Sequence, residues 1–410
     1  MIGSGGSRVQ FKDGGPADLC IIGGAGHVGL PMAILFASRG MKVIVHDIDE
    51  AAVERLAAGH MPFVEEGAEP LLHKVLADGT LAFTSSLSDI RGVPTVIVTI
   101  GTPVDEYLNP VIDVVRRLAN DLSPHLSANQ LLIFRSTLCP GTMNWLAAYL
   151  KENGPVPLLA YCPERIVQGR AILELQQLPQ IVSGVTPEAE EAAARFFSQI
   201  SPSVVRLSPL EAEFAKLFCN AYRYIQFAAT NQFYVIANSA GVDYSRVVKA
   251  VRTDYDRMAD FPGAGLAAGP CLFKDTMQLL AASNNKFFLG HVAVLANEGL
   301  ANYLVERMQE RWPLREKVVG LLGMAFKANI DDVRSSLSYK LKRLLRFACA
   351  EVLTTDPLVT KDTQLLPLEE VVNRSDILIL CVPHDAYRGL DTKGKPVLDV
   401  WGFFGKGCLI

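Results

Sequence analysis

The chain has 410 residues, of which 50% are hydrophobic and 20% charged, and its formal net charge is −4. This balance is typical of a folded protein with two or three domains, and it excludes a disordered chain. The small negative charge gives no field that would attract nucleic acid, and the apolar runs fall short of the roughly 20 residues of a membrane span.

The N-terminal half shows the strand–turn–helix pattern of a parallel α/β domain. Residues 1–17 are rich in Gly and Ser, lack the apolar core of a secretory signal and predict a flexible leader. Then come an apolar run at 19–22, a glycine-rich turn, a helix at 30–39 and a strand at 42–46. Further runs of strand length lie at 95–100, 131–134, 158–161 and 180–183. Alternating strands and helices predict a doubly wound, mostly parallel sheet.

The pattern changes after residue 208. A long helix is predicted at 209–240, and a Gly- and Pro-rich stretch follows at 261–270. A second α/β pattern comprises a strand at 318–322, a helix at 338–349 and strands at 377–382 and 396–400. The sequence therefore predicts an α/β fold in which two Rossmann-like, doubly wound parallel-sheet domains, 18–207 and 313–410, flank a central helical domain, 208–312.

The eight cysteines are scattered, with no CxxC pair and no His cluster nearby. This spacing argues against a disulfide framework and against a metal site, and it favours a reducing cytoplasm. Most of these cysteines are predicted to be small buried hydrophobic residues.

A dinucleotide-binding motif follows the first predicted strand. Gly24-x-Gly26-x-x-Gly29 connects this strand to a helix, and Asp47 ends the next strand 18 residues after Gly29. The glycines allow a tight turn and close approach of a pyrophosphate, and the acid can accept the ribose hydroxyls. A carboxylate would repel a 2′-phosphate, so NAD is preferred over NADP; the alternative is a purely structural turn. The predicted cofactor contacts here are Gly24, Gly26, His27, Val28, Gly29 and Asp47.

Polar residues end several later strands of the predicted sheet. Two such segments are 101–103 (Gly-Thr-Pro) and 136–142, which begins Ser-Thr, while Glu164 ends a third strand. The carboxyl ends of parallel strands form the ligand crevice, so these residues can line it. The alternatives are ordinary loops and, for Glu164, a solvated acid.

Two further features lie downstream. Lys216 and Asn220 are four residues apart on the long helix and share one face, which is either a solvated face or part of a site. Cys271 follows the glycine-rich stretch and precedes Lys274 and Asp275. A nearby cation favours the nucleophilic thiolate, whereas the alternative is a buried inert thiol.

Taken together, these residues resemble one family, the UDP-sugar/GDP-mannose 6-dehydrogenases, from about residue 18 to residue 402. The matching segments occur in the family's order: Gly24 to Pro31, Gly101-Thr102-Pro103, Ser136-Thr137 with Pro140-Gly141-Thr142, Pro163-Glu164, Ala212-Glu213-x-x-Lys216-x-x-x-Asn220-Ala221, Cys271 with Lys274-Asp275, and Leu322-Gly323-x-Ala325-Phe326-Lys327 with Asp332-x-Arg334.

The resemblance implies a four-electron oxidation of a sugar C6 hydroxymethyl group to a carboxylate with two NAD. Cys271 is expected to form a thiohemiacetal and then a thioester, while Lys216 and Asn220 hold the oxyanion. The resemblance also implies proton-transfer roles: Asp275 and Thr137 orient a water, and Glu164 is the base when water attacks the thioester.

Ligand contacts and assembly are implied in the same way. The expected NAD contacts outside the first turn are Gly101, Thr102, Pro103, Ser136 and Arg334. The expected nucleotide-sugar contacts are Glu164, Arg165, Lys216, Asn220, Arg257, Gly269 and Lys327. Family members are usually homodimers joined through the central helix.

The segment 164–169 bears on the choice of sugar. Its Glu164-Arg165 form resembles the branch that acts on UDP-N-acetylmannosamine or UDP-N-acetylglucosamine, and the ending Val400-Trp401-Gly402 points the same way. UDP-glucose and GDP-mannose are the alternatives. Departures from the common family pattern are Gly269-Pro270 where Gly-Gly is usual, His27 where Tyr is common and Cys139 where Pro is common.

Two rival functions share part of this pattern. A two-electron hydroxyacid dehydrogenase shares the broad fold, but it needs neither Cys271 nor an α/β domain after residue 318. A non-catalytic nucleotide-sugar sensor would keep the pocket, yet it has no need of Cys271, Lys216, Asn220 and Asp275 together.

Overall fold

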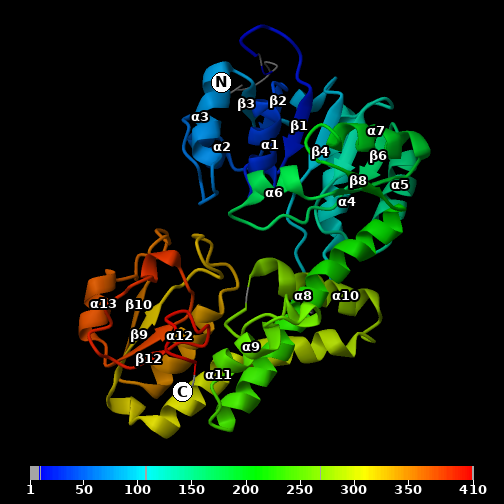
Figure 1. The fold of residues 1–410 in the computed structure, drawn as a ribbon. Helices are drawn as coiled ribbons and strands as arrows, with labels where there is room; N and C mark the ends of the chain where they lie inside the picture. Colours follow the sequence, from blue (N-terminus) through cyan, green and yellow to red (C-terminus); the bar gives the residue numbers. More distant parts are fainter. Residues whose placement is uncertain (1–8, 10, 107–108, 268, 409–410) are drawn as a thin grey trace. The chain divides into compact units, whose positions relative to one another are not determined.

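The computed structural model describes residues 9, 11–106, 109–267 and 269–408 (Figure 1). These residues form two compact units that divide between Phe218 and Cys219, within the long helix α8, Pro209–Ser239. The predicted domain boundaries near residues 207 and 312 mark changes in the kind of secondary structure. They do not coincide with the division between the two compact units, and they stay a prediction.

The first unit is built on an eight-stranded sheet of order β3-β2-β1-β4-β5-β6-β7-β8. All neighbouring strands are parallel except β6 and β7, so the sheet is mostly parallel, as predicted. The strands are β1 Leu19–Ile22, β2 Val43–His46, β3 Leu81–Thr84, β4 Thr95–Val98, β5 Leu131–Phe134, β6 Leu158–Tyr161, β7 Gln180–Gly184 and β8 Val204–Arg206. The order reverses at β1 and β4, which creates the crevice that binds ligands in such sheets.

Helices cover both faces of this sheet. They are α1 Gly29–Ser38, α2 Glu50–Ala57, α3 Ala68–Asp78, α4 Ile112–Leu122, α5 Thr142–Asn153, α6 Ala171–Gln177 and α7 Pro187–Phe197, with 3₁₀ turns η1 Leu87–Ile90 and η2 Ser123–His125. Successive side chains of β1 alternate between two cores: Leu19 and Ile21 face one, Cys20 and Ile22 the other. This burial of both faces explains why the strands read as unbroken apolar runs.

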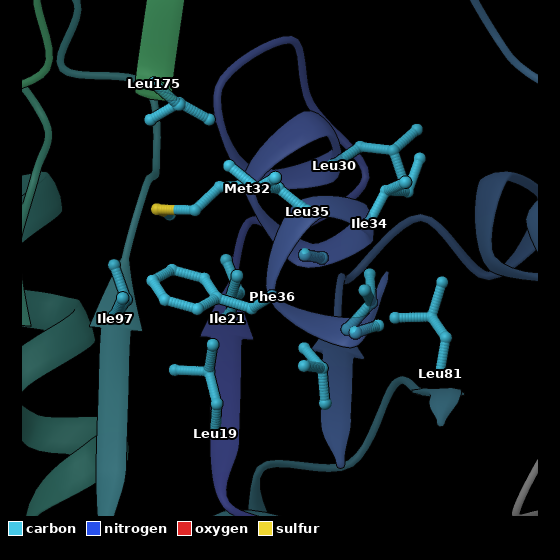
Figure 2. Close-up of a cluster of buried hydrophobic side chains, with 14 of the residues drawn as sticks. Leu19, Ile21, Leu30, Met32, Ile34, Leu35, Phe36, Leu81, Ile97 and Leu175 are labelled. Atoms are coloured by element: carbon cyan, nitrogen blue, oxygen red, sulfur yellow. The ribbon is translucent and has the colours of Figure 1, made fainter. Parts of the chain in front are cut away.

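The helix α1 lies at the centre of one core. Every residue of α1 except Ser38 is buried. Figure 2 shows Phe36 and Met32 of α1 between Ile21 of β1, Ile97 of β4 and Leu175 of α6. A helix buried on all sides must be apolar all round, which fixes α1 against the sheet and positions the turn that precedes it.

The predicted leader, 1–17, is described only at residue 9 and from Phe11 onward. Phe11 is buried in the second core of the first unit, and Lys42 Nζ lies 2.7 Å from Asp13 Oδ2. This part of the segment packs on the domain, whereas the sequence predicted a flexible leader.

The second unit contains a four-stranded parallel sheet of order β10-β9-β11-β12. Its strands are β9 Val318–Leu322, β10 Glu351–Thr355, β11 Ile377–Leu380 and β12 Val397–Leu398. Its helices beyond α8 are α9 Tyr244–Arg252, α10 Pro270–Ala282, α11 Phe288–Arg311, α12 Leu337–Ala348 and α13 Leu368–Arg374, with 3₁₀ turns η3 Asp256–Met258, η4 Leu314–Glu316 and η5 Asp385–Tyr387. Leu304 of α11 and Leu341 of α12 share a core with Leu321 of β9, while Val371 of α13 covers the other face.

No helix in the described part of the chain is both long enough and apolar enough to cross a membrane.

Candidate active site

The turn between β1 and α1 has the close packing that a dinucleotide site requires. A Cβ at Gly29 would lie 2.7 Å from Thr99 Oγ1, so only glycine lets the helix approach the strand in this way. The N-cap residue of α1 is Val28, whose side chain has no oxygen to bind the first N–H groups of the helix. Those groups and the positive end of the helix dipole can therefore receive a pyrophosphate.

Asp47 lies beside this turn at the end of β2. Its Oδ2 accepts a hydrogen bond from Ala25 N–H at 3.1 Å and its Oδ1 accepts one from Asp49 N–H at 3.2 Å. A carboxylate offers about four acceptor positions, so these two bonds leave capacity for ribose hydroxyls. Asp47 and the turn together fit NAD, as the sequence predicted.

Two hydrogen bonds tie together the loops that follow β4 and β5. Ser136 Oγ donates to the carbonyl of Ile100 at 2.6 Å, and Thr102 Oγ1 donates to the carbonyl of Thr137 at 2.6 Å. Because β4 and β5 are neighbours, the polar residues of both loops meet at the carboxyl edge of the sheet. Thr102 and Ser136 are buried, and Thr137 is half-buried.

Glu164 pairs with Arg135, a residue with no predicted role. Arg135, which directly follows β5, is fully buried; its Nε donates to Glu164 Oε2 at 3.1 Å and its Nη2 contacts the same oxygen. The other oxygen, Oε1, accepts from the N–H groups of Arg165 and Ile166 at 2.7 and 2.9 Å. Burial alone would raise the pKa of Glu164, but the charge and hydrogen bonds of Arg135, with these N–H groups, lower it. Glu164 is thus ionised near neutral pH but weakly basic.

The loop after Glu164 reaches back to the glycine turn. Gln168 Nε2 lies 3.0 Å from Nδ1 of His27, whose ring contacts that of Phe63 at an angle of 37° with the centroids 3.9 Å apart. Glu65 accepts hydrogen bonds from the N–H groups of Gly169, at 2.9 Å, and Ala171. The loop 164–171 is therefore held at its start by Glu164, in its middle by Gln168 and at its end by the N–H groups of Gly169 and Ala171.

Glu213, near the start of α8, binds the first turn of α5. Its two carboxylate oxygens accept from the N–H groups of Gly141 at 2.6 Å and Met143 at 2.8 Å. Gly141, the N-cap of α5, has no side chain that could do so. This contact fixes the start of α8, and with it Lys216 one turn further on, relative to the loop 136–142.

In the second unit, Asn220 and Asp275 are brought together as a hydrogen-bonded pair. Asn220 Nδ2 donates to Asp275 Oδ2 at 2.5 Å, and Lys274 Nζ lies 3.5 Å from Asp275 Oδ1. Asp275 is fully buried, whereas Cys271 is exposed. Cys271 is the second residue of α10, one turn before Asp275, and the N-terminal turn of a helix stabilises a thiolate. An exposed thiol in this position contradicts the alternative of a buried inert cysteine.

The loop before Cys271 packs against the C-terminal α/β segment. Gly269 has φ of 118°, and a Cβ there would lie 2.8 Å from the ring of Phe326. A Cβ at Gly265 would lie 2.3 Å from the ring of Trp401. The motif after β9 and the ending after β12 therefore shape the approach to Cys271.

The remaining predicted residues of this unit differ in their surroundings. Arg334 donates to both carboxylate oxygens of Asp332, from Nε to Oδ1 at 3.0 Å and from Nη2 to Oδ2 at 2.6 Å. The hydrogen bond with Asp332 is the main cause that raises the pKa of Arg334, and the charge of Cys271 adds to it. Lys327 is half-buried after β9, and Arg257 lies exposed on η3.

Arg135, Glu65 and the pairing of Gln168 with His27 were missed from the sequence. Arg135 had a signal, because a charged residue directly after a buried apolar strand must find a partner. The other contacts had none, since Gln168 is 141 residues from His27 and Glu65 is 104 residues from Gly169.

Three models of one family match the chain in succession. The NAD-binding domain of the UDP-glucose/GDP-mannose dehydrogenase family matches residues 17–201, its central domain residues 210–296 and its UDP-binding domain residues 320–406. The chain belongs to the UDP-glucose/GDP-mannose dehydrogenase family. It is an NAD-dependent nucleotide-sugar dehydrogenase, and NAD is its cofactor.

Several relatives of this dehydrogenase align over most of its length. A UDP-N-acetyl-D-mannosamine dehydrogenase from Pyrococcus horikoshii is 29% identical over 381 residues, which cover 90% of each chain. A UDP-glucose 6-dehydrogenase from Bacillus subtilis is 26% identical and covers 88% of this chain and 81% of its own. The solved structure of a UDP-glucose dehydrogenase from Pyrobaculum islandicum superposes with a TM-score of 0.87 at 27% identity, over 96% of this chain and 97% of that one. The predicted fold class is thereby confirmed.

Proposed function

We propose that this dehydrogenase oxidises the C6 hydroxymethyl group of a UDP-N-acetylhexosamine, N-acetylmannosamine or N-acetylglucosamine, to a carboxylate. The observation that carries the proposal is the cluster of the exposed Cys271 thiol and the buried Asn220–Asp275 pair at the start of α10. Bound NAD accepts a hydride from the sugar carbon in each of two oxidation steps.

Cys271 supplies the step that a two-electron dehydrogenase lacks. Its thiolate adds to the C6 aldehyde, and the resulting thiohemiacetal takes up one proton. Loss of a hydride and that proton gives the thioester, and water then releases the carboxylate and restores the thiol. The balance is one alcohol, two NAD⁺ and one water giving one carboxylate, two NADH and three protons.

The other residues stabilise charge and move protons. The amide of Asn220 and the ammonium of Lys216 bind the developing oxyanion of each tetrahedral intermediate. Asp275 and Thr137 orient the water that carries protons away. Glu164 acts as base in hydrolysis. Its ion pair with Arg135 keeps the carboxylate ionised for that role but also makes it a weaker base.

A cavity in the second unit supports binding of the nucleotide there. A cavity of about 400 Å³ lies between α9 and the loop that leads to Cys271, lined among others by Lys249, Arg252, Gly263 and Trp401. Two cations suit a diphosphate, and an indole ring suits a planar base.

The choice of sugar is supported by the segment 164–169 and by relatives. UDP-N-acetyl-D-mannosamine dehydrogenases from Pyrococcus horikoshii and Campylobacter jejuni are 29% and 25% identical to this chain. The alternative, UDP-glucose, is favoured by the TM-score of 0.87 with the Pyrobaculum islandicum enzyme.

The same proposal includes a homodimer in a reducing cytoplasm. Large apolar side chains stand exposed on α8 and α11, which pack together through a 2.9 Å hydrogen bond from Asn231 Nδ2 to Asn297 Oδ1. They are Tyr222, Phe233 and Ile236 of α8, and Phe288, Leu289, Val292 and Leu295 of α11. A second copy of the chain would cover this face. The eight cysteines are all free thiols, which supports a reducing compartment.

Replacing the proposed nucleophile tests this mechanism. We expect Cys271→Ala to lower uronic acid formation by at least about a thousandfold, because the aldehyde can no longer be captured as a thiohemiacetal. NAD affinity, measured by calorimetry, is expected to stay within about twofold, since the cofactor turn lies in the first unit. Cys219→Ala, at an exposed cysteine on α8, is the matched control. Acid production by Cys271→Ala near the wild-type rate would refute the thioester route.

A further inference from the structure

The loop 164–171 connects β6 to α6. It contacts three other parts of the first unit: Arg135, the segment of Glu65 and Glu66, and the cofactor turn. At its base Glu164 pairs with Arg135, and at its end Glu65 binds the N–H groups of Gly169 and Ala171. Glu66 N–H also donates to the Gly169 carbonyl at 3.1 Å. These contacts fix the ends of the loop independently of any ligand.

In the middle of the loop, Val167 N–H donates to Glu174 Oε2 at 2.6 Å, and a second contact joins Gln168 to the cofactor turn. Gln168 Nε2 lies 3.0 Å from Nδ1 and 3.3 Å from Nε2 of His27. His27 belongs to the cofactor turn itself, between Gly26 and Gly29, and its ring rests on Phe63. Gln168 and His27 are both half-buried, so the contact is partly shielded from water.

The position of His27 makes this contact sensitive to the cofactor. The backbone N–H groups of the residues 26–29 would hold the dinucleotide pyrophosphate, and His27 is one of these residues. A turn restrained in this way would also restrain His27, and through the contact with His27 it would restrain Gln168 in the loop that follows Glu164. Without cofactor, the imidazole and the amide lose that restraint together.

We infer that the Gln168–His27 contact couples NAD binding to the ordering of the loop that follows Glu164, residues 165–171, which includes the expected sugar contact Arg165. The coupling itself rests on contacts within the first unit and on NAD. Only its consequence, tighter binding of the sugar once cofactor is present, rests on the proposed function.

Hydrogen exchange with NAD alone tests the coupling without any sugar. In the wild type, saturating NAD is expected to slow amide exchange in the residues 165–171 at least about fivefold. Gln168→Met keeps the length of the side chain but removes the amide, and His27→Phe keeps the ring but removes its nitrogens. Each variant is measured at an NAD concentration that saturates it, set from its own affinity, and both are expected to lose the slowing in the loop. Gln177→Met, at an exposed glutamine near the end of α6, is the matched control and is expected to behave like the wild type.

Two outcomes would overturn the inference. One is a wild-type loop whose exchange does not respond to NAD. The other is a loop that NAD protects equally in the wild type and in both variants. Because two different substitutions remove the contact, failure of one variant to fold still leaves the other to decide.

A second measurement addresses the consequence for the sugar. NADH, which prevents turnover, is expected to tighten binding of UDP-N-acetylglucosamine at least about fivefold in the wild type and less than about twofold in Gln168→Met. Equal tightening in both proteins would contradict the coupling. If the wild type binds no nucleotide sugar, the proposed function fails, while the exchange measurement with NAD still decides this inference.

Discussion

Carboxylates in both units bind backbone N–H groups of distant loops. Asp47 binds Ala25, Glu65 binds Gly169, and Asp356 binds the N–H groups of Met324 at 2.6 Å and Ala325 at 3.0 Å. A charged acceptor makes a stronger hydrogen bond to an N–H group than a neutral one does, so each contact fixes a loop firmly.

Asp47 and Asp356 occupy equivalent places in the two sheets but have different capacities. Each follows the strand beside the first strand of its sheet and binds the turn after that first strand. Asp356 Oδ1 also accepts from the N–H groups of Leu358 and Val359, and its Oδ2 lies 3.1 Å from His384 Nε2. Asp47 therefore retains acceptor capacity for a ribose, whereas groups of the protein itself occupy the acceptor positions of Asp356.

The Asp356 carboxylate predicts a dependence of stability on acid. Burial opposes its ionisation, but the hydrogen bond and charge of His384 and the backbone N–H groups outweigh burial and lower its pKa to about 2, from 3.8. A depressed pKa contributes stability that is present above pH 4 and is lost as the pH falls towards 2. Asp356→Asn is expected to lower the free energy of unfolding by about 2 kcal/mol at pH 7, measured by urea unfolding.

The control for this prediction is the pH series itself. The difference between wild type and Asp356→Asn should shrink between pH 4 and pH 2, because the wild-type carboxylate becomes protonated there. A difference that stays constant over this range would contradict the assignment of the effect to ionised Asp356.

A side chain of another helix, α8, caps the N-terminus of α5. Glu213 of α8 binds the N–H groups of Gly141 and Met143, so that the cap, the loop 136–142 and the start of α8 form one structure. Its charge also lies at the positive end of the α5 dipole.

Removing this cap is expected to destabilise the protein. Glu213→Ala should lower the free energy of unfolding by about 1–2 kcal/mol, the usual effect of losing an N-cap carboxylate, as measured by urea unfolding. Glu152→Ala, at an exposed residue on α5, is the matched control and should change it by less than about 0.5 kcal/mol. An equal loss of unfolding free energy in the two variants would show that the Glu213 contact contributes nothing to stability.

The strands that the sequence predicted lie within about two residues of their predicted bounds, whereas β3 and β8 were not predicted. β1, β5, β6 and β9 have the predicted bounds, since a strand buried on both faces is an apolar run that ends where the chain leaves the sheet. The longer predictions at 95–100, 377–382 and 396–400 end earlier in the structure, at Val98, Leu380 and Leu398. In each case apolar residues continue into the loop beyond the last pair of the ladder.

The candidate site was predictable where chemistry is local in sequence. The glycine turn, Asp47 and the segment from Cys271 to Asp275 carry their own pattern within a few residues. Contacts such as Arg135 with Glu164, or Gln168 with His27, join strands and turns far apart in the chain. They depend on sheet order and loop path, which a single sequence does not specify.

For the whole molecule, the exposed apolar face of α8 and α11 predicts how the chain assembles. Ile236 is 64% exposed and Leu295 61% exposed, and both would be buried by a second copy. Ile236→Glu with Leu295→Glu is expected to convert a dimer into a monomer of 44.6 kDa, measured by light scattering after gel filtration. Phe347→Glu, at a 91% exposed residue on α12, is the matched control and should leave the dimer intact. A monomeric wild type, or a double variant that stays dimeric, would contradict this interface.

The two units together predict a complete four-electron enzyme, since the first contains the cofactor turn and the second contains the thiol. The measurement that tests this most directly is the amount of NADH formed per sugar consumed, with UDP-N-acetylmannosamine, UDP-N-acetylglucosamine, UDP-glucose and GDP-mannose as substrates. The account predicts two NADH for each sugar, with a UDP-N-acetylhexosamine as the preferred substrate. One NADH per sugar would mean that oxidation stops at the carbonyl and that Cys271 takes no part in it.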